Sequence, residues 1–275
     1  MKSPITWYGG KYYSLKILLK YIPNHTTYVE VFGGAASLLF AKNPSKVEVY
    51  NDSLSGLVNL FRVLRDKEKF DKFYEQINLI PYSREEFIYA RKNRDPEDEI
   101  ERTVNWFVLI RQSFSGNMKT WGYSINAANR LFNERISKYL NTVKNLPQAH
   151  RRLFLVQMEN LDYREIIPKY DMEDTFFYLD PPYVLSTRKD KNYEHEMSDE
   201  DHKELISILL KIKGKVMLSG YDNTIYRELE DNGWTKIQYD IQCCAPNSKD
   251  TTGTRERRIE SVWMNYKHIF QFGHK

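Results

Sequence analysis

Four residues at the end of an aromatic-rich apolar run have types that suit the binding of an amine. They are Asp180, Pro181, Pro182 and Tyr183, and they follow the run TFFYL. Proline lacks an N–H group and has a fixed φ, so two in succession form a stiff turn whose carbonyls lack local donors. Asp180 and the carbonyl of Pro181 therefore offer two hydrogen-bond acceptors at one place, and no cation is obviously dedicated to them.

Two acceptors that face one spot suit an amino group with two hydrogens. The ring of Tyr183 offers a flat surface on which an aromatic ligand can stack. An exocyclic amine on a stacked base fits both features. The alternative is an acid that ends a strand before a proline turn and has no ligand.

The segment VFGGAAS is a second candidate site, because Gly33 and Gly34 lie between an apolar run and a helix. Glycines at such a turn let a ligand approach the backbone closely. The pattern is not the GxGxxG of dinucleotide-binding proteins, so a nucleoside without a phosphate is favoured. Asp52 ends the next apolar run, where an acid can accept hydrogen bonds from ribose hydroxyls. Tight packing of the glycines and a helix N-cap role for Asp52 are the alternatives.

Apolar runs that alternate with amphipathic segments predict the sheet that positions both sites. Strands are expected at residues 28–32, 46–52, 152–157, 175–180 and 214–220. A helix from Ala35 to Ala41 connects the first two, which indicates a parallel sheet with right-handed crossovers. Such sheets bind ligands at the carboxyl ends of their strands. WTKIQYDIQCCA and RRIESVWMNYK predict a C-terminal antiparallel hairpin whose connection spans residues 246–256.

The middle of the chain has a different pattern. Residues 57–150 carry apolar residues at helical spacing and few strand signals, which predicts a helical insertion. We expect residues 1–56 and 151–275 to form one α/β domain around it. Two later helices are also expected, one that begins after Ser198 as its N-cap and one that ends at Gly233.

Composition narrows the class of protein only slightly. The net charge of +4 is compatible with a polyanionic partner but does not require one, and the 20 tyrosines can stack on bases or fill a core. No apolar stretch approaches the roughly 18 residues of a membrane span, and the N-terminus lacks a signal-peptide core, so a cytoplasmic protein is expected. Cys243, Cys244, His195 and His202 form no pattern that suggests a disulfide or a zinc site.

Three segments together resemble the Dam-type (D12 class) adenine-N6 DNA methyltransferases. They are WYGGK at residues 7–11, EVFGGAAS at 30–37 and DPPY at 180–183. The resemblance runs from Trp7 to about Tyr266. Further matching segments are VYND, ENLDYRE, LSGYD and RRIESVWMNY.

The resemblance implies a fold and a methyl donor. The fold is α/β, a Rossmann-like S-adenosylmethionine-dependent methyltransferase fold with a mostly parallel sheet, helices on both faces and a C-terminal antiparallel hairpin. Residues 1–56 and 151–275 would be the catalytic domain, and the helical insertion 57–150 would recognise the DNA target. S-adenosyl-L-methionine would give its methyl group and become S-adenosyl-L-homocysteine, with no metal required.

The resemblance also assigns site residues. Those that would border the methionine part of the donor are Trp7, Gly9, Gly10 and Lys11. Those that would line the centre of the donor are Glu30, Phe32, Gly33, Gly34 and Ala35. Asp52 would hold the ribose hydroxyls, and Asp162 and Tyr163 would approach the adenine of the donor. The quartet that begins with Asp180 would be catalytic. Lys11 would neutralise the donor carboxylate or order the site, the alternative being a surface lysine.

Two loops are expected to contact DNA. The first, rich in Gly, Asn and Ser, covers residues 115–130, and the candidates at and before it are Arg111, Ser115, Asn117, Lys119 and Trp121. The second follows the quartet, could close as a flap over a flipped base, and contributes Arg188, Lys189 and Lys191. Relatives that act on GATC carry a stretch like FNGLxR where this chain has FSGNMK, so GATC is not predicted as the target.

The predicted reaction is site-specific transfer of a methyl group to N6 of an adenine flipped out of duplex DNA. One alternative keeps the fold but changes the acceptor to cytosine N4, an RNA base or a protein amide, and Asp180 in place of Ser or Asn argues against it. Another is a catalytically silent DNA-binding regulator, which the intact quartet disfavours. We expect a monomer, encoded by a bacterium or phage, for which a separately encoded restriction nuclease is a candidate partner.

Overall fold

A computed structural model describes residues 1–7, 9–125, 133–187, 195–242 and 257–267. The chain divides into two compact units. The first unit comprises Met1–Gly10, Gly34–Ala41 and Asp52–Asn160. The second comprises Lys11–Gly33, Lys42–Asn51 and Leu161–Lys275. These boundaries enclose the predicted helical insertion but add two earlier segments to it; the function of each unit remains a prediction.

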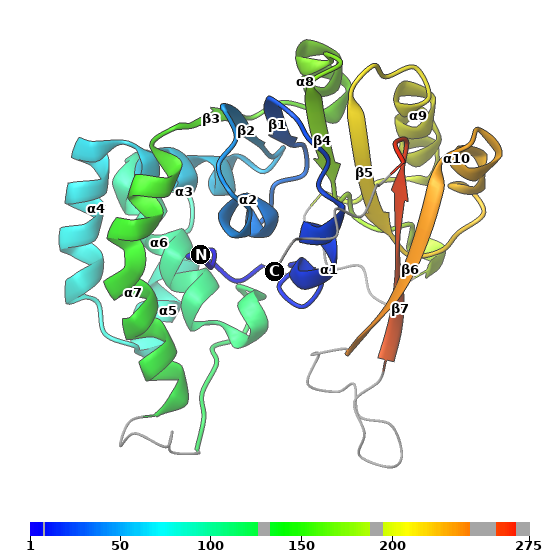
Figure 1. Ribbon diagram of the computed structural model, residues 1–275. Coiled ribbons are helices and arrows are strands. Elements are labelled where there is room, and N and C mark those ends of the chain that lie inside the picture. Colours follow the sequence, from blue (N-terminus) through cyan, green and yellow to red (C-terminus); the bar gives the residue numbers. More distant parts are fainter. Residues whose placement is uncertain (8, 126–132, 188–194, 243–256, 268–275) are drawn as a thin grey trace, which may run out of the picture. The chain divides into compact units, whose positions relative to one another are not determined.

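The first unit is mainly helical (Figure 1). Its elements are α2 (Ser37–Ala41), α3 (Ser55–Arg65), α4 (Lys67–Leu79), α5 (Arg84–Lys92), α6 (Glu99–Gln112), η2 (Phe114–Gly116), α7 (Glu134–Leu153) and β3 (Val156–Glu159). Helix α6 is central, because all of its residues from Thr103 to Ile110 are buried. Side-chain oxygens of Asp66, Ser83 and Asp98 cap the starts of α4, α5 and α6, which the sequence supports locally.

The strand predicted at residues 152–157 was placed wrongly, because the observed strand β3 covers Val156–Glu159. Helix α7 continues to Leu153, and the strand begins only at Val156. Leu146, Ala149 and Leu153 are all buried, and their spacing puts them on one face of the helix. The helical face therefore extends through residues that also fit a short apolar strand.

The second unit contains a mostly parallel sheet. Its strands are β1 (Thr27–Glu30), β2 (Val47–Asn51), β4 (Thr175–Leu179), β5 (Lys215–Gly220), β6 (Thr235–Gln242) and β7 (Arg257–Met264). β1 pairs in parallel with β2 and β4, and β4 pairs in parallel with β5. β7 pairs antiparallel with β5 and β6. Within this unit the strand order is β2-β1-β4-β5-β7-β6. The mostly parallel sheet with its C-terminal antiparallel pair confirms the predicted fold class and the C-terminal hairpin.

Short and medium helices complete the second unit. They are α1 (Leu15–Leu18), η1 (Leu19–Tyr21), α8 (Tyr163–Tyr170), η3 (Leu185–Thr187), α9 (Asp199–Leu209) and α10 (Arg227–Asp231). Ser198 caps α9 as predicted, and it exchanges hydrogen bonds with Asp201 in a capping box. The last predicted helix is reduced to α10, and Gly233 follows it with a positive φ of 84°.

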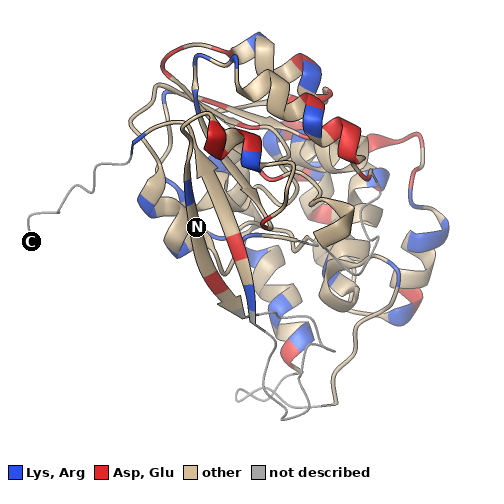
Figure 2. Ribbon diagram, turned by 90° about the vertical axis from the view of Figure 1, so that its right-hand side faces the viewer, with Lys and Arg blue, Asp and Glu red and all other residues tan. Residues whose placement is uncertain are grey.

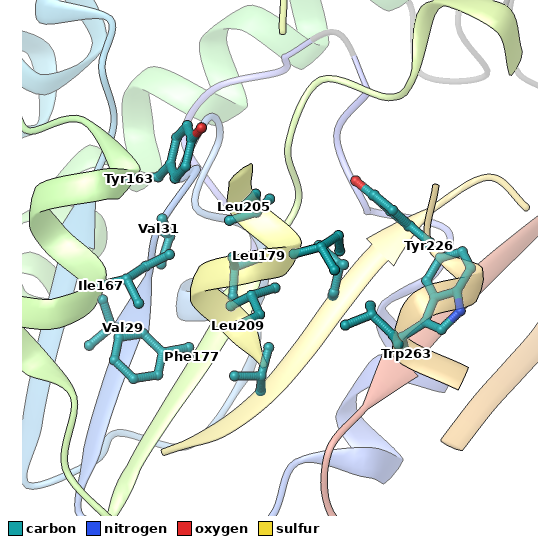
Figure 3. Close-up of a cluster of buried hydrophobic side chains, with 14 of the residues drawn as sticks. Val29, Val31, Tyr163, Ile167, Phe177, Leu179, Leu205, Leu209, Tyr226 and Trp263 are labelled. Atoms are coloured by element: carbon teal, nitrogen blue, oxygen red, sulfur yellow. The ribbon is translucent and has the colours of Figure 1, made fainter. Parts of the chain in front are cut away.

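The core of the second unit joins the sheet to its helices (Figure 3). All five residues of β4 are buried, as expected for an inner parallel strand covered on both faces. Phe177 and Leu179 of β4 belong to a buried cluster with Leu205 of α9, Ile167 of α8 and Trp263 of β7. This packing makes the carboxyl end of β4 a rigid place from which to present the residues that follow it.

Charged residues are distributed over the ribbon without a plain division by sign. Lysine and arginine alternate with aspartate and glutamate along the helices in Figure 2. Within the described ranges, no helix has both the length and the apolar character that a membrane crossing needs. The hairpin connection at residues 246–256, Cys243 and Cys244 lie outside the described residues.

Candidate active site

The carboxylate of Asp180, directly after β4, pairs with the ammonium group of Lys11. Nζ of Lys11 lies 2.8 Å from Oδ1 of Asp180, and the two side chains are 5% and 17% exposed. The carbonyl of Lys11 accepts hydrogen bonds from the N–H groups of Ser14 and Leu15, which fixes Lys11 at the start of α1. Lys11 is therefore a buried lysine and not a surface lysine. Because it pairs with Asp180, the expectation that no cation is dedicated to Asp180 is wrong.

The protonation of Asp180 is set by opposing influences. Burial raises its pKa to about 6, because a low-dielectric environment disfavours the charged form, and Lys11 opposes this shift. Glu260 raises the same pKa by repulsion. Asp180 therefore changes charge within the ordinary pH range and is an ionised acceptor above about pH 6.

Tyr183 lies in the same part of the second unit, but little of its ring is accessible. The residue is 7% exposed. Nζ of Lys11 lies over the ring at 4.8 Å from its centroid, and Tyr221 makes an edge contact at 4.6 Å between centroids. Burial raises the pKa of the Tyr183 hydroxyl well above its usual value, so the hydroxyl is neutral. Stacking of a base on Tyr183 remains a prediction and requires that one face become accessible.

A further buried acid belongs to this region and was missed from the sequence. Glu260 of β7 is 6% exposed, and its Oε2 accepts hydrogen bonds from Oγ of Ser14 and from the hydroxyl of Tyr239, both at 3.1 Å. The signal was available, because Glu260 is a single acid within the run IESVWM of a strand. Its partners come from two distant segments, which no local pattern specifies.

Glu30 and the residues that were predicted near the adenine of the donor have their own contacts. Glu30 is buried at the end of β1 and accepts a 2.8 Å hydrogen bond from the hydroxyl of Tyr28. Tyr163 is buried and contacts the ring of Phe32 at 5.9 Å. Asp162 caps α8 through the N–H of Arg164. These contacts give structural roles to the residues, and their contact with a donor remains a prediction.

Gly33 is required by packing. Its N–H donates a 2.7 Å hydrogen bond to the carbonyl of Asn51. A Cβ atom at this position would lie 2.1 Å from Cε2 of Tyr50, a distance that no real structure tolerates. The tight-packing alternative therefore explains Gly33.

In the first unit, the carboxylate of Asp52 bonds the turn at Gly34. Gly34 has a positive φ of 48°, and its N–H donates a 2.8 Å hydrogen bond to Oδ2 of Asp52. Oδ1 of Asp52 accepts a hydrogen bond from the N–H of Leu54, which is itself the N-cap of α3. Asp52 is therefore not the helix N-cap, and its carboxylate holds the glycine turn.

The N-terminal residues of the predicted donor site meet this turn within the first unit. The N–H of Gly10 donates to the carbonyl of Trp7 at 3.0 Å, and Gly9 has a positive φ of 74°. A Cβ atom on Gly34 would lie 3.2 Å from Cδ1 of Trp7. Ala35 is buried beside Gly34 in the chain. The structure thus brings three predicted segments together in this unit: residues 7–10, the glycine turn and Asp52.

The residues that were predicted to contact DNA divide into exposed and internally bonded groups. Ser115 and Lys119 are exposed. Asn117 accepts hydrogen bonds from the N–H groups of Lys119 and Thr120 through its Oδ1. The guanidinium of Arg111 donates to Oγ1 of Thr6 and of Thr142, and burial lowers its pKa to about 10. Arg111 and Asn117 therefore stabilise the first unit, whatever else they contact.

Trp121 contacts Tyr123, an aromatic residue that was not predicted from the sequence to bind DNA. Its ring stacks on that of Tyr123 at 6.2 Å between centroids with an interplanar angle of 16°. The guanidinium of Arg84 lies 4.6 Å from the centre of the Trp121 ring. Tyr123 is 66% exposed, so it presents a flat, supported surface.

The remaining predicted DNA contacts, Arg188, Lys189 and Lys191, lie outside the described residues. His202 is buried, and its Nδ1 bonds the hydroxyl of Tyr226 at 2.9 Å, which agrees with an ordinary structural histidine. Among the residues with a described position, no group of three or more His, Cys, Asp or Glu is arranged to hold a metal ion.

Comparisons with known proteins identify the family of this chain. Residues 7–240 match the family of D12 class N6 adenine-specific DNA methyltransferases. The type II methyltransferase M.CviBI of Paramecium bursaria Chlorella virus NC1A is 27% identical over 249 residues, which are 87% of this chain and 90% of that protein. M.MjaIII of Methanocaldococcus jannaschii is 26% identical, over 81% and 85% of the two chains. A DNA adenine methylase of Salmonella typhimurium is 23% identical, over 92% and 91%.

The mostly parallel sheet with its C-terminal antiparallel pair agrees with the α/β methyltransferase fold that the family match implies. The chain belongs to the D12 class N6 adenine-specific DNA methyltransferase family. It is therefore an adenine-specific DNA methyltransferase that uses S-adenosylmethionine as methyl donor.

Proposed function

We propose that the carboxylate of Asp180 and the carbonyl of Pro181 accept hydrogen bonds from the two N–H groups on N6 of the target adenine. The observation that supports this role is the largely buried Asp180 carboxylate directly after β4, with a pKa of about 6 and with Lys11 as its counter-ion. The N6 lone pair of adenine is delocalised into the ring and is a poor nucleophile. Two accepted hydrogen bonds favour a more tetrahedral nitrogen. Its lone pair would then form a bond to the methyl carbon as the carbon–sulfur bond of the donor breaks, and N6 would lose one of its two protons. Preorganised acceptors and positioning supply most of the rate enhancement.

The residues of the first unit fit the chemistry of the donor. Glycines at positions 9, 10 and 34 leave the backbone open to close approach, and Asp52 provides a carboxylate for ribose hydroxyls. S-adenosylmethionine supplies a methyl group on a sulfonium ion when it is bound. In this proposal the segment with Trp7, the turn at Gly34 and Asp52 hold and orient it. The structural roles of Gly33 and Asp52 are compatible with a role in donor binding, since both residues shape the backbone at the glycine turn.

The target base must leave the duplex to reach Asp180, at a cost of a few kcal/mol. Stacking on Tyr183, which is worth about 1–3 kcal/mol per base, would offset part of that cost. Because Lys11 lies over the ring and Tyr221 packs against it, we propose that base entry moves at least one of them.

Exposed residues of the loop that follows α6 are the proposed DNA contacts. Ser115 and Lys119 are accessible and can contact phosphates or base edges. Tyr123, supported by Trp121, offers a ring that can stack on a base. Contacts to phosphates would position the DNA, and contacts to bases would make the reaction site-specific. The experiment below identifies the recognised sequence.

The relatives named type II methyltransferases support a role in protecting DNA beside a separately encoded restriction nuclease. Measurement of nuclease protection after methylation tests it. We also propose that the protein is a monomer, that residues 1–56 and 151–275 carry catalysis, and that residues 57–150 recognise the DNA target.

The decisive experiment uses purified protein, S-adenosylmethionine with a labelled methyl group, and unmethylated genomic DNA. The DNA is digested to nucleosides for mass spectrometry, and a second sample is sequenced for modified bases. Label on N6 of adenine at a defined sequence is expected. Label on cytosine N4 would overturn the acceptor, and DNA that carries no label would overturn DNA as the substrate.

A further inference from the structure

Glu260 is a buried acid that the proposed reaction does not use. A carboxylate at 6% exposure is stable only if hydrogen bonds and opposite charge compensate its lost hydration. The hydroxyls of Ser14 and Tyr239 supply two hydrogen bonds to its Oε2. The compensating charge must come from its surroundings in the second unit.

Ser14 connects Glu260 to the segment that carries Lys11. The N–H of Ser14 donates to the carbonyl of Lys11 at 2.9 Å, and the carbonyl of Ser14 accepts from Leu18 at 3.0 Å. The bond between Ser14 and Glu260 therefore fixes the first turn of α1 against β7. The hydroxyl of Tyr239 interacts electrostatically with both Glu260 and Lys11, so the two opposite charges belong to one cluster. The same ammonium group contacts Asp180 at 2.8 Å.

We infer that Glu260 is a positioning residue for methyl transfer: it fixes the segment of Lys11 and shares the charge of Lys11 with Asp180. The inference rests on the proposed role of Asp180 as the acceptor of the adenine amine. An ammonium paired with Asp180 alone would draw electron density from that carboxylate and weaken it as an acceptor. A second carboxylate in the cluster reduces this attraction, so Asp180 remains a strong acceptor.

The charges around Asp180 determine the sign of the expected effect. Among the described residues, the ionisable groups that interact with its carboxyl from the packed elements are Lys11, Glu260, Tyr183, Tyr178 and Tyr226. Burial raises the pKa of each of the three tyrosines well above its usual value, so they stay neutral between pH 5 and 8. Lys11 lowers the pKa of Asp180 and Glu260 raises it. Removal of the charge on Glu260 must therefore lower the pKa of Asp180.

The direct test is an NMR titration of the free protein with carboxyl-labelled aspartate. The resonance of Asp180 is assigned by its absence in Asp180→Asn. A midpoint of about 6 is expected for the wild type. Glu260→Gln keeps an acceptor oxygen without the charge and is expected to lower the midpoint by about one pH unit. Glu260→Asp moves the charge away and is expected to lower it by less, which keeps a test available if the Gln variant does not fold. Glu173→Gln removes the charge of an exposed acid in the same unit and serves as the control, with an unchanged midpoint.

Kinetics complete the test. In Glu260→Gln the acid limb of kcat/KM should move to lower pH together with the NMR midpoint, and kcat at pH 8 should fall roughly tenfold while donor affinity stays within twofold. A residue with a merely structural role would leave the midpoint in place. An unchanged or raised midpoint in the Gln and Asp variants overturns the inference for Glu260. Activity that survives in Asp180→Asn overturns the proposed function instead, whatever the titration shows.

Discussion

Lys11 and Asp180 show how the surroundings of one carboxyl decide its chemistry. An aspartate in water is ionised above about pH 4, but burial raises the pKa of Asp180 to about 6 despite the ion pair with Lys11. The ionised form accepts hydrogen bonds on both oxygens, whereas the protonated form does not. At the scale of single residues, activity should therefore follow the ionisation of Asp180.

The pH dependence of the wild type follows with a definite sign. Because the pKa of Asp180 is raised, the group is protonated below about pH 6 and ionised above it. We expect kcat/KM to rise about tenfold per pH unit up to pH 6 and to level off above pH 7. Methyl transfer to a short duplex in buffers of constant ionic strength measures this. A rate that is level from pH 5 to 8 would contradict the assignment.

Asp180→Asn tests the acceptor role directly. The amide keeps the size of the side chain but loses the charge and presents donors in place of one acceptor. We expect kcat to fall by at least about a hundredfold. DNA affinity, measured by fluorescence anisotropy, should change by less than about twofold. An active Asn variant would remove Asp180 from the mechanism.

Lys11→Met should have the opposite effect on pH dependence from Glu260→Gln. Loss of the ammonium leaves the buried carboxylate without its ion pair, so the pKa of Asp180 should rise by at least about one unit. The acid limb of kcat/KM would then lie near pH 7 or above. Lys46→Met removes an exposed lysine of the same unit and serves as the control. An acid limb that stays near pH 6 in Lys11→Met would show that the ion pair does not act on Asp180.

At the scale of elements, the strand ends and helix starts are what place these residues. β4 is bonded on both edges by β1 and β5, and its five residues are buried, so the turn that follows is rigid. Helix α9 packs Leu205 and Leu209 into the same core. Its start is set by the capping box between Ser198 and Asp201.

Ser198→Ala tests that capping box. Loss of an N-cap hydroxyl costs about 1 kcal/mol of stability, because the N–H of Asp201 loses its partner in the helix. Urea unfolding at an unchanged m-value should show this loss. Ser207→Ala, at an exposed position within the same helix, should leave stability unchanged or raise it slightly. Equal effects of the two changes would contradict the role of Ser198.

At the scale of the whole molecule, the protein combines a parallel-sheet unit with a mainly helical unit. The second unit carries Asp180, Tyr183 and Glu260, and the first carries Asp52 and the candidate DNA contacts in and before the loop after α6. Affinity for DNA depends on phosphate contacts, each of which releases counterions and adds to the dependence on salt. The number of such contacts is therefore measurable by titrating DNA binding at several salt concentrations.

Lys119→Ala should weaken DNA binding and reduce the slope of log K against log salt by about one unit. The side chain of Lys119 is exposed in the loop after α6. Lys72→Ala removes an equally exposed lysine from α4, where no DNA contact is predicted, and should leave the slope unchanged. The same change of slope in both variants would show a general charge effect in place of a contact.

Local patterns in the sequence determined much of this protein. Buried runs such as TFFYL form inner strands, and Ser198 followed by acids begins a helix, because these features depend on residues a few positions apart. The motifs around Gly33 and Asp180 also identified the family. The strand at 152–157 could not be placed correctly, since its residues fit both a helical face and a strand, and only the packing of Leu153 decided between them.

The tertiary structure alone decided which charges meet. Asp180, Glu260 and the segment with Lys11 and Ser14 are far apart in the chain. Their contacts depend on β7 lying beside β5 and on α1 following the turn of Lys11. It also decided that Asp52 holds a glycine turn and does not cap a helix. The physical reason is that burial and electrostatics act through space, so the pKa of Asp180 is a property of the folded chain and of no segment within it.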